Sequence, residues 1–171
     1  MPQLADPNFA RTVVLLCEHE ADGALGLVVN RPTPFTLGQL YEGQGIAGEG
    51  SSDAPIHYGG PVQPERGFVL YEGGRDYDGS MPVLDELKLG TSLDILRDLS
   101  EGRGPDRFLF FLGYAGWAPD QLEAEIARND WLAVPADPSL LFAVEPEERW
   151  EQAIRLLGIE PGLLTQTFGT A

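Results

Sequence analysis

The chain has 171 residues, of which 43% are hydrophobic and 22% are charged, and its formal net charge is −16. This length suits one compact domain, and this composition excludes an intrinsically disordered chain. The excess of acidic residues repels phosphate backbones, so we expect no direct contact with nucleic acid.

Short sequence patterns exclude several further classes of protein. No apolar run is long enough for a membrane span, and the first residues lack the basic and apolar parts of a signal peptide. Cys17 is the only cysteine, so no internal disulfide can form and we expect a cytoplasmic location. With two histidines in the chain, we expect no metal site, and no motif indicates a cofactor.

The first elements in chain order are two strands joined by a tight turn. Residues 12–18 form a continuous apolar run rich in β-branched side chains, which is typical of a strand buried on both faces. Asp22-Gly23 is a hairpin signal, and residues 24–30 form the returning strand. Gly26 within that strand indicates a bulge or a close approach of another backbone.

The middle of the chain alternates short strands with two helices. Thr36 is the predicted N-cap of a short helix, and residues 42–54 form a surface loop. A second helix runs to Leu99, with Leu93 and Leu96 on its apolar face. The strands predicted between these helices cover residues 56–58, 67–72 and 81–89.

The last third opens with an apolar strand over residues 107–112 that runs into a turn holding Tyr114 and Trp117. A helix follows from Pro119, because proline suits the first helical turn. Two short strands are predicted at residues 131–134 and 140–142. The final helix opens near residue 146 and carries an apolar stripe of Trp150, Ala153, Ile154 and Leu157.

These elements predict an α+β fold, with one domain over residues 1–171 and a mixed, mostly antiparallel sheet covered by helices. Strands outnumber helices, and short turns join several adjacent strands, which favours antiparallel pairing. No linker separates regions of different composition, and the sequence contains no internal repeat.

Sequence blocks along nearly the whole chain carry a family resemblance. They include Met1-Pro2, Glu18-His19, Gly23-Ala24-Leu25-Gly26-Leu27-Val28-Val29-Asn30-Arg31-Pro32, Gly59-Gly60-Pro61-Val62, Thr91-Ser92-Leu93-Asp94, Gly113-Tyr114-Ala115-Gly116-Trp117 and Asn129-Asp130-Trp131-Leu132. In these blocks and their order, the chain resembles the AlgH/YqgE family of small bacterial proteins. It departs from the family pattern at Tyr71, where a histidine is common, and in lacking the apolar strand that members carry ahead of the Met-Pro pair.

The resemblance implies a bacterial protein of uncharacterised chemistry. The family is named after a regulator of alginate synthesis, and its members are sometimes described as transcriptional regulators. No catalytic residue or cofactor is established for it, so none is carried over to this chain. Since the chain is acidic and shows no helix-turn-helix signal, a regulatory role would act indirectly, through another protein.

Polar and glycine pairs at strand ends are candidate binding groups. Asn30 and Arg31 end a buried strand, where Arg31 can bind a carboxylate or phosphate or can satisfy strand-end carbonyls. Gly59 and Gly60 can expose backbone N–H groups to a ligand or can form a sharp turn.

Tyr114 and Trp117 complete the predicted surface. Exposed at a turn, these two aromatics would form a docking platform for a partner; buried, they would fill the core beneath the following helix. The surrounding glycines resemble a nucleophile elbow in outline, but the required serine is absent, so hydrolase chemistry is not indicated.

Two weaker hypotheses concern chemistry. Cys17 and His19 lie two residues apart and would form a thiolate site if both pointed the same way, although a buried thiol without reactivity is favoured. Asp76, Asp78 and Asp85 lack the remaining ligands of a calcium loop. Whether the protein is an enzyme is left open at this point.

The leading hypothesis from the sequence is therefore a non-enzymatic cytosolic module. It would bind an unknown protein partner or a small ligand near Asn30-Arg31, Gly59-Gly60 and Tyr114-Trp117, because the unusual residues are glycines and aromatics at turns. The alternatives are an indirect regulator of transcription and, less favoured, an enzyme using Cys17 and His19.

Overall fold

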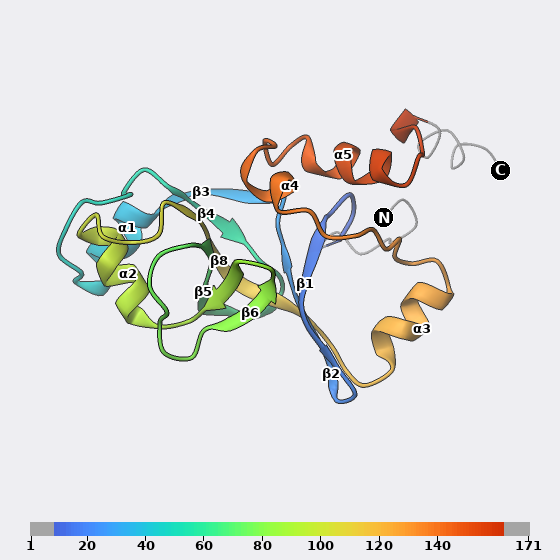
Figure 1. The fold of residues 1–171 in the computed structure, drawn as a ribbon, viewed down its shortest axis with the longest axis horizontal. Helices are drawn as coiled ribbons and strands as arrows, with labels where there is room; N and C mark the ends of the chain where they lie inside the picture. The colour runs from blue at the N-terminus through green and yellow to red at the C-terminus, as the bar shows by residue number, and fades with distance from the viewer. Residues whose placement is uncertain (1–8, 163–171) are drawn as a thin grey trace.

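Residues 9–162 are described by the computed structural model, and they form one eight-stranded, mostly antiparallel sheet that curves toward a barrel (Figure 1). The path of paired strands begins at β1 (Val14–Glu20) and ends at β6 (Met81–Leu84). These two end strands contact each other, which brings the sheet close to closure. The antiparallel character that the sequence predicted is confirmed.

The helices gather at two ends of the sheet (Figure 1). At one end, α1 (Leu37–Gln44) lies close to α2 (Leu93–Ser100). The later helices lie at the other end and are α3 (Gln121–Ala127), α4 (Pro138–Phe142) and α5 (Arg149–Leu156). A layer of helices covering the sheet, as the sequence predicted, is not confirmed.

Strand β8 (Arg107–Trp117) organises the sheet because it exchanges partners along its length. Its first half pairs antiparallel with β5 (Val62–Glu72) and parallel with β4 (Pro55–Tyr58). Its last residues pair instead with β2 (Gly23–Val28), which forms the predicted hairpin with β1. The remaining strands are β3 (Pro32–Thr36), which pairs with β4, and β7 (Leu87–Gly90), which joins β5 to β6.

The exchange of partners occurs at Gly113, whose φ of +72° breaks the alternation of side chains along β8. Before this residue, Phe110 and Leu112 face one apolar cluster and Phe111 faces another. A Cβ atom on Gly113 would lie 2.3 Å from the carbonyl oxygen of Gly60, so a side chain is excluded there. Glycine is therefore required where β8 bends from one set of partners to the next.

The turn predicted at residues 113–117 is wrong, because these residues continue β8. The glycines indicated a turn, whereas pairing with β2 keeps the backbone extended as far as Trp117. Asp120, with φ of +61°, makes the turn into α3 instead.

Four other predictions are also corrected. Residues 81–89 form the β6–β7 hairpin instead of one strand, because Asp85 adopts a left-handed φ of +43°. Residues 131–134 are irregular, and residues 140–142 belong to α4, where the Asp137 side chain accepts a hydrogen bond from Ser139 N–H. In α2 the buried face holds Ile95, Leu96 and Leu99, whereas Leu93 is exposed.

Three apolar clusters hold the sheet to its helices. The first joins α1 and α2 to one face of β5 and β8 and contains Tyr41, Tyr71 and Phe110. The second fills the curved interior of the sheet between β1, β2, β5 and β7. The third is small, lies where β8 meets α3, and includes Trp117 and Leu122. Within residues 9–162, none of the helices combines the length and apolar character that crossing a bilayer requires.

Candidate functional site

The predicted polar pair at the end of β2 fastens the segment that leads into β1. The Asn30 amide donates to the carbonyl oxygen of Arg11 at 2.9 Å, and its Oδ1 accepts from the backbone N–H of Val13 at 2.8 Å. The Arg31 guanidinium donates to the carbonyl oxygen of Ala10 at 3.0 Å. These contacts match the structural alternative that the sequence allowed for this pair.

Gly59 and Gly60 lie inside the sheet, where strands pass too close for any side chain. Gly59 accepts a hydrogen bond from Val28 N–H at 2.8 Å and donates to Leu112 at 2.9 Å, so it joins β2 to β8. A Cβ atom on Gly60 would lie 2.2 Å from the carbonyl carbon of Tyr114. The backbone of β8 therefore occupies the space that a ligand would need beside these glycines.

The two predicted aromatics face opposite sides of β8. Tyr114 packs edge-on against Phe68, with ring centroids 5.7 Å apart, and belongs to the interior cluster. Trp117 packs edge-on against Trp131 at 5.8 Å and is 8% exposed. The structure therefore brings Gly60 and Tyr114 together but separates both from Trp117.

Trp117 lines an apolar cavity of about 220 Å³, here called the tryptophan cavity. It lies along β1 and the end of β8, enclosed by α3, residues 131–137, α4 and α5. Figure 1 shows these elements around β1, at the end of the sheet opposite α1 and α2. All three tryptophans of the chain line the cavity: Trp117, Trp131 and Trp150.

Exposed apolar side chains extend the lining of the tryptophan cavity toward solvent. Leu16 is 40% exposed, and Ile126 and Leu132 are each 38% exposed. Large apolar side chains that stay accessible in one hollow are a common mark of a binding site, whereas isolated ones are ordinary. This cavity is the candidate functional site.

Glu125 of α3 fixes the aromatic wall of the tryptophan cavity. Its Oε2 accepts a hydrogen bond from the indole N–H of Trp117 and another from that of Trp131, both at 2.8 Å. Its Oε1 accepts from the Gln121 amide at 2.9 Å. Partial burial alone would raise the pKa of Glu125, but these hydrogen bonds outweigh it and hold the pKa below its usual value.

Arg149, at the start of α5, is the buried cation of the tryptophan cavity. It is 4% exposed and donates from Nε to the carbonyl oxygen of Val144 at 3.0 Å and from Nη2 to that of Leu141 at 2.6 Å. Its Nη1 donates to the carbonyl oxygen of Val29. Burial lowers the pKa of Arg149, and the more distant charges of Glu145 and Glu147 oppose that shift.

The geometry of Cys17 and His19 does not favour a thiolate site. Cys17 is buried, as predicted, and burial raises the pKa of its thiol to about 12. The His19 ring lies at the surface and pairs with Glu123 of α3 through Nε2 and Oε1, 2.5 Å apart. A thiol with this pKa stays protonated at neutral pH and is a poor nucleophile.

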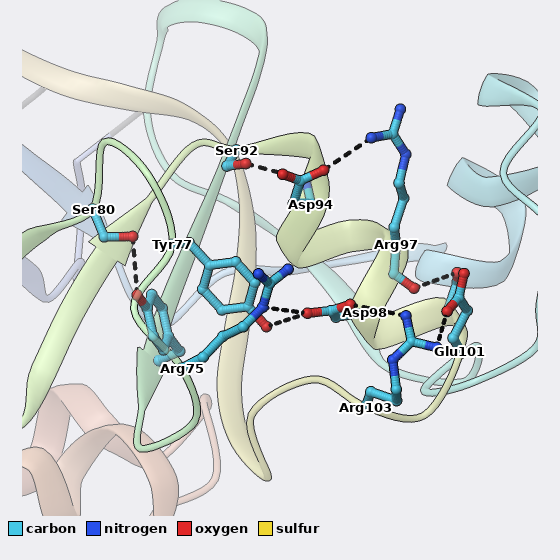
Figure 2. Close-up of polar contacts among 11 residues, drawn as sticks. Arg75, Tyr77, Ser80, Ser92, Asp94, Arg97, Asp98, Glu101 and Arg103 are labelled. Atoms are coloured by element: carbon cyan, nitrogen blue, oxygen red, sulfur yellow. Dashed lines mark hydrogen bonds and ion pairs between the residues drawn. The ribbon is translucent and has the colours of Figure 1, made fainter.

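A separate cluster of charges around Asp98 joins a loop to α2 (Figure 2). The Asp98 carboxylate accepts hydrogen bonds from Arg75 at 2.8 Å, from the Tyr77 hydroxyl at 3.0 Å and from Arg103 at 3.3 Å. Arg75 also lies over the Tyr77 ring, 4.5 Å from its centroid. Since each of these groups is matched by a partner, the cluster is best explained as a fastening between loop and helix.

The acidic residues considered for a cation do not gather into a site. Asp76 forms an ion pair with Lys88 instead. Among residues 9–162, no group of three or more His, Cys, Asp or Glu side chains is placed to hold a metal ion.

Sequence reasoning found Trp117 but missed the groups that complete the tryptophan cavity, chiefly Glu125, Trp131 and Arg149. One signal was available, because Arg149 immediately precedes Trp150, which begins the buried apolar stripe that Ala153 and Ile154 continue. An arginine next to that apolar stripe lies close to the boundary between helix and sheet, where its charge needs hydrogen-bond partners or water.

Comparison with known proteins supports one family. A UPF0301 protein of Ralstonia nicotianae is 49% identical over 173 residues that cover 100% of this chain and 91% of the relative. Another, from Chromobacterium violaceum, is 44% identical, with 100% and 93% covered.

Two solved structures share the fold. The solution structure of the AlgH protein from Pseudomonas aeruginosa has a TM-score of 0.82 and 46% identity and covers 100% of this chain and 92% of its own. A Corynebacterium diphtheriae protein, at 22% identity, has a TM-score of 0.71 over 96% of this chain and 85% of its own. The AlgH-like family pattern matches residues 1–162, and this chain belongs to the AlgH-like family.

Proposed function

We propose that this protein is a non-enzymatic binding module that takes a small ligand with an apolar part into the tryptophan cavity. The observation that carries the proposal is the convergence of all three tryptophans on one hollow that stays accessible. Tryptophan buries a large apolar area and is favoured where a ligand or partner docks. The proposal moves the predicted binding surface from the Asn30, Gly59 and Tyr114 region to the cavity beside Trp117.

The walls of the cavity support this proposal because contacts within the chain hold them in place. Glu125 orients two indoles through hydrogen bonds, and Leu122 anchors α3 in the small cluster beneath them. A site whose walls are already ordered loses less conformational entropy when a ligand enters. The described residues that line the cavity include no Ser, Cys, His or Lys side chain, which favours binding over catalysis.

A cytoplasmic location forms part of the proposal. Cys17 is a free thiol, and free thiols are typical of reducing compartments. The acidic surface implied by the net charge of −16 keeps the molecule soluble and disfavours nucleic acid as a partner.

A neutral fluorescent probe, N-phenyl-1-naphthylamine, tests the site directly. We expect saturable binding to the wild-type protein, reported by enhanced probe fluorescence and by changed tryptophan emission. Ile126→Glu should weaken this binding at least tenfold, because it places a charge in the apolar lining at a position that is already 38% exposed.

Leu156→Glu is the matched control. Leu156 also lies on a helix and is 51% exposed, but it lies outside the lining of the tryptophan cavity. This variant should bind the probe as the wild type does. Absence of saturable binding to the wild type, or equal binding by the Ile126→Glu variant, would overturn the proposed site.

A further inference from the structure

The charge of Arg149 lacks an ionic partner within the described part of the chain. A guanidinium has five N–H donors, and the three hydrogen bonds that Arg149 makes all go to neutral backbone carbonyls. No Asp or Glu oxygen among residues 9–162 lies within ion-pair distance of it. Buried arginines are normally paired with a carboxylate, because an uncompensated charge away from water is costly.

The position of Arg149 relates this charge to the tryptophan cavity. Arg149 and Trp150 both line it, at the end where α5 meets α4 and the end of β2. A second cation, Arg11, lies over the Trp150 ring, 4.8 Å from its centroid. Arg11 is not part of the lining, in which Arg149 is the cation and Asp137, the N-cap of α4, is the acidic residue. Leu16, Leu122 and Ile126 belong to the apolar walls of the hollow.

We propose that the ligand of the tryptophan cavity is a small amphipathic carboxylate, an anion with an aliphatic tail, whose head pairs with Arg149. This inference rests on the proposed function and adds the chemical class of the ligand. The three carbonyl bonds hold the guanidinium plane in place and leave two of its N–H donors for the carboxylate. The tail would lie among the tryptophans and Ile126.

Charge complementarity favours an anion over a neutral ligand of the same size. The chain as a whole carries −16 and would repel anions, so a local cation is needed to hold one. A carboxylate is planar and accepts parallel hydrogen bonds from a guanidinium, which matches the fixed fork of Arg149 better than a single-point contact. Charge-assisted hydrogen bonds of this kind are roughly twice as strong as neutral ones.

Octanoate and 1-octanol form the test pair, because they share one tail and differ in head group. Each competes with N-phenyl-1-naphthylamine for the wild-type protein at pH 8, where octanoate is ionised. We expect octanoate to displace the probe at a concentration at least tenfold lower than octanol does. Equal displacement by the two compounds, or a preference for octanol, would overturn the inference while leaving the proposed function standing.

Arg149→Gln separates the charge from the tail contacts. The Gln amide can still donate to a carbonyl, and it removes the positive charge. In this variant octanoate and octanol should displace the probe at similar concentrations, because the charge that distinguishes the two head groups is gone. A preference for octanoate that persists in a folded Arg149→Gln protein would contradict the assignment of the head group to Arg149.

Failure of the probe itself has a different meaning. If the neutral probe, octanol and octanoate all fail to bind the wild type, the proposed function falls and the inference falls with it. The wild-type comparison needs no substitution, so the inference stays testable even if the Arg149→Gln protein does not fold. Circular dichroism and the unfolding midpoint establish folding for each variant.

Discussion

At the residue scale, single side chains join elements that are distant in sequence. Arg149 of α5 binds carbonyls of Val29 and Leu141, and Glu125 of α3 binds indoles from β8 and from the segment that follows α3. Each of these side chains forms hydrogen bonds with several partners at once, so another amino acid of similar shape cannot replace it. The hydrogen bonds of these two side chains therefore control the shape of the tryptophan cavity more than their positions in the helices do.

Glu125→Gln should lower the free energy of unfolding by about 2 kcal/mol, within the range for hydrogen bonds to a charged acceptor. The Gln amide nitrogen cannot accept a hydrogen bond, so at least one of the donors from Trp117, Trp131 and Gln121 loses its partner. Urea unfolding at pH 7, followed by tryptophan fluorescence, measures the change.

Glu151→Gln supplies the comparison for that measurement. Glu151 pairs with Arg155 on the exposed surface of α5 at 3.3 Å, and such a pair contributes about 0.5 kcal/mol or less. Equal losses in the two variants would show that Glu125 does not anchor the aromatic wall.

At the element scale, β8 determines the architecture because one strand serves two sets of partners. Gly113 lets it bend, and Gly59 and Gly60 let the neighbouring backbone approach it closely. The sequence singled out these glycines as candidates for ligand binding, whereas the structure gives them a packing role. These glycines are needed because the backbone of β8 passes close to them. A contact with a strand so distant in sequence cannot be inferred from the residues around the glycines.

Gly60→Ala should destabilise the protein by at least about 3 kcal/mol, since it combines a clash with backbone strain. The added Cβ atom would lie 2.2 Å from the carbonyl carbon of Tyr114, and the φ of Gly60 is +152°. Thermal unfolding followed by circular dichroism measures the effect.

Gly43→Ala is the opposite case and serves as the control for Gly60→Ala. Gly43 lies inside α1, and nothing lies within 4 Å of a Cβ atom added there. Alanine should stabilise this helix by about 1 kcal/mol. If Gly60→Ala left the unfolding midpoint unchanged, the close contact between this glycine and β8 would be refuted.

At the scale of the whole molecule, the sequence predicted those elements that depend on residues close together in the chain. Elements that depend on pairing between distant strands were not predicted. The Asp22-Gly23 hairpin and the buried stripe of α5 were predicted because the residues that form them are close in sequence. The continuation of β8 to Trp117 depends on β2, which lies some ninety positions earlier in the chain. The split of residues 81–89 was missed because Asp85 makes its turn without a glycine.

The candidate site divides in the same way. Trp117 was predicted as a candidate binding residue because, with Tyr114, it flanks Gly116 at what the sequence indicated to be a turn. Arg149 was not, because its partners belong to β2's end, α4 and the α4–α5 connection, and only the folded chain brings them together. Sequence thus identified one wall of the tryptophan cavity, while the charged end required the structure.

His57 connects this charged end to the stability of the whole protein. It is buried in β4, and its Nδ1–H donates to the carbonyl oxygen of Phe110 at 3.3 Å. Burial lowers the pKa of His57 from 6.5 to about 4, the hydrogen bond opposes this shift, and the positive charge of Arg149 adds to it. The unfolded chain therefore takes up a proton near pH 6.5 that the folded protein accepts only near pH 4.

Between these two values the unfolded state binds more protons, so stability should fall as the pH is lowered. From pH 7 to pH 5, His57 alone should reduce the free energy of unfolding by about 2 kcal/mol. Four carboxylates have a pKa that is held low, and they lose their contributions to stability only at lower pH: Asp98, Glu123, Glu125 and Asp137. Urea titrations at pH 7, 6 and 5 measure the slope.

His57→Gln should flatten that slope, because glutamine does not titrate and its amide can still donate toward Phe110. His19→Gln should retain the slope, since it removes the other histidine and leaves His57 in place. If the slope survived in the His57→Gln protein, protonation elsewhere would control the acid sensitivity. If it vanished, the neutral His57 ring beside the cation of Arg149 would be the group that weakens the fold between pH 7 and pH 5.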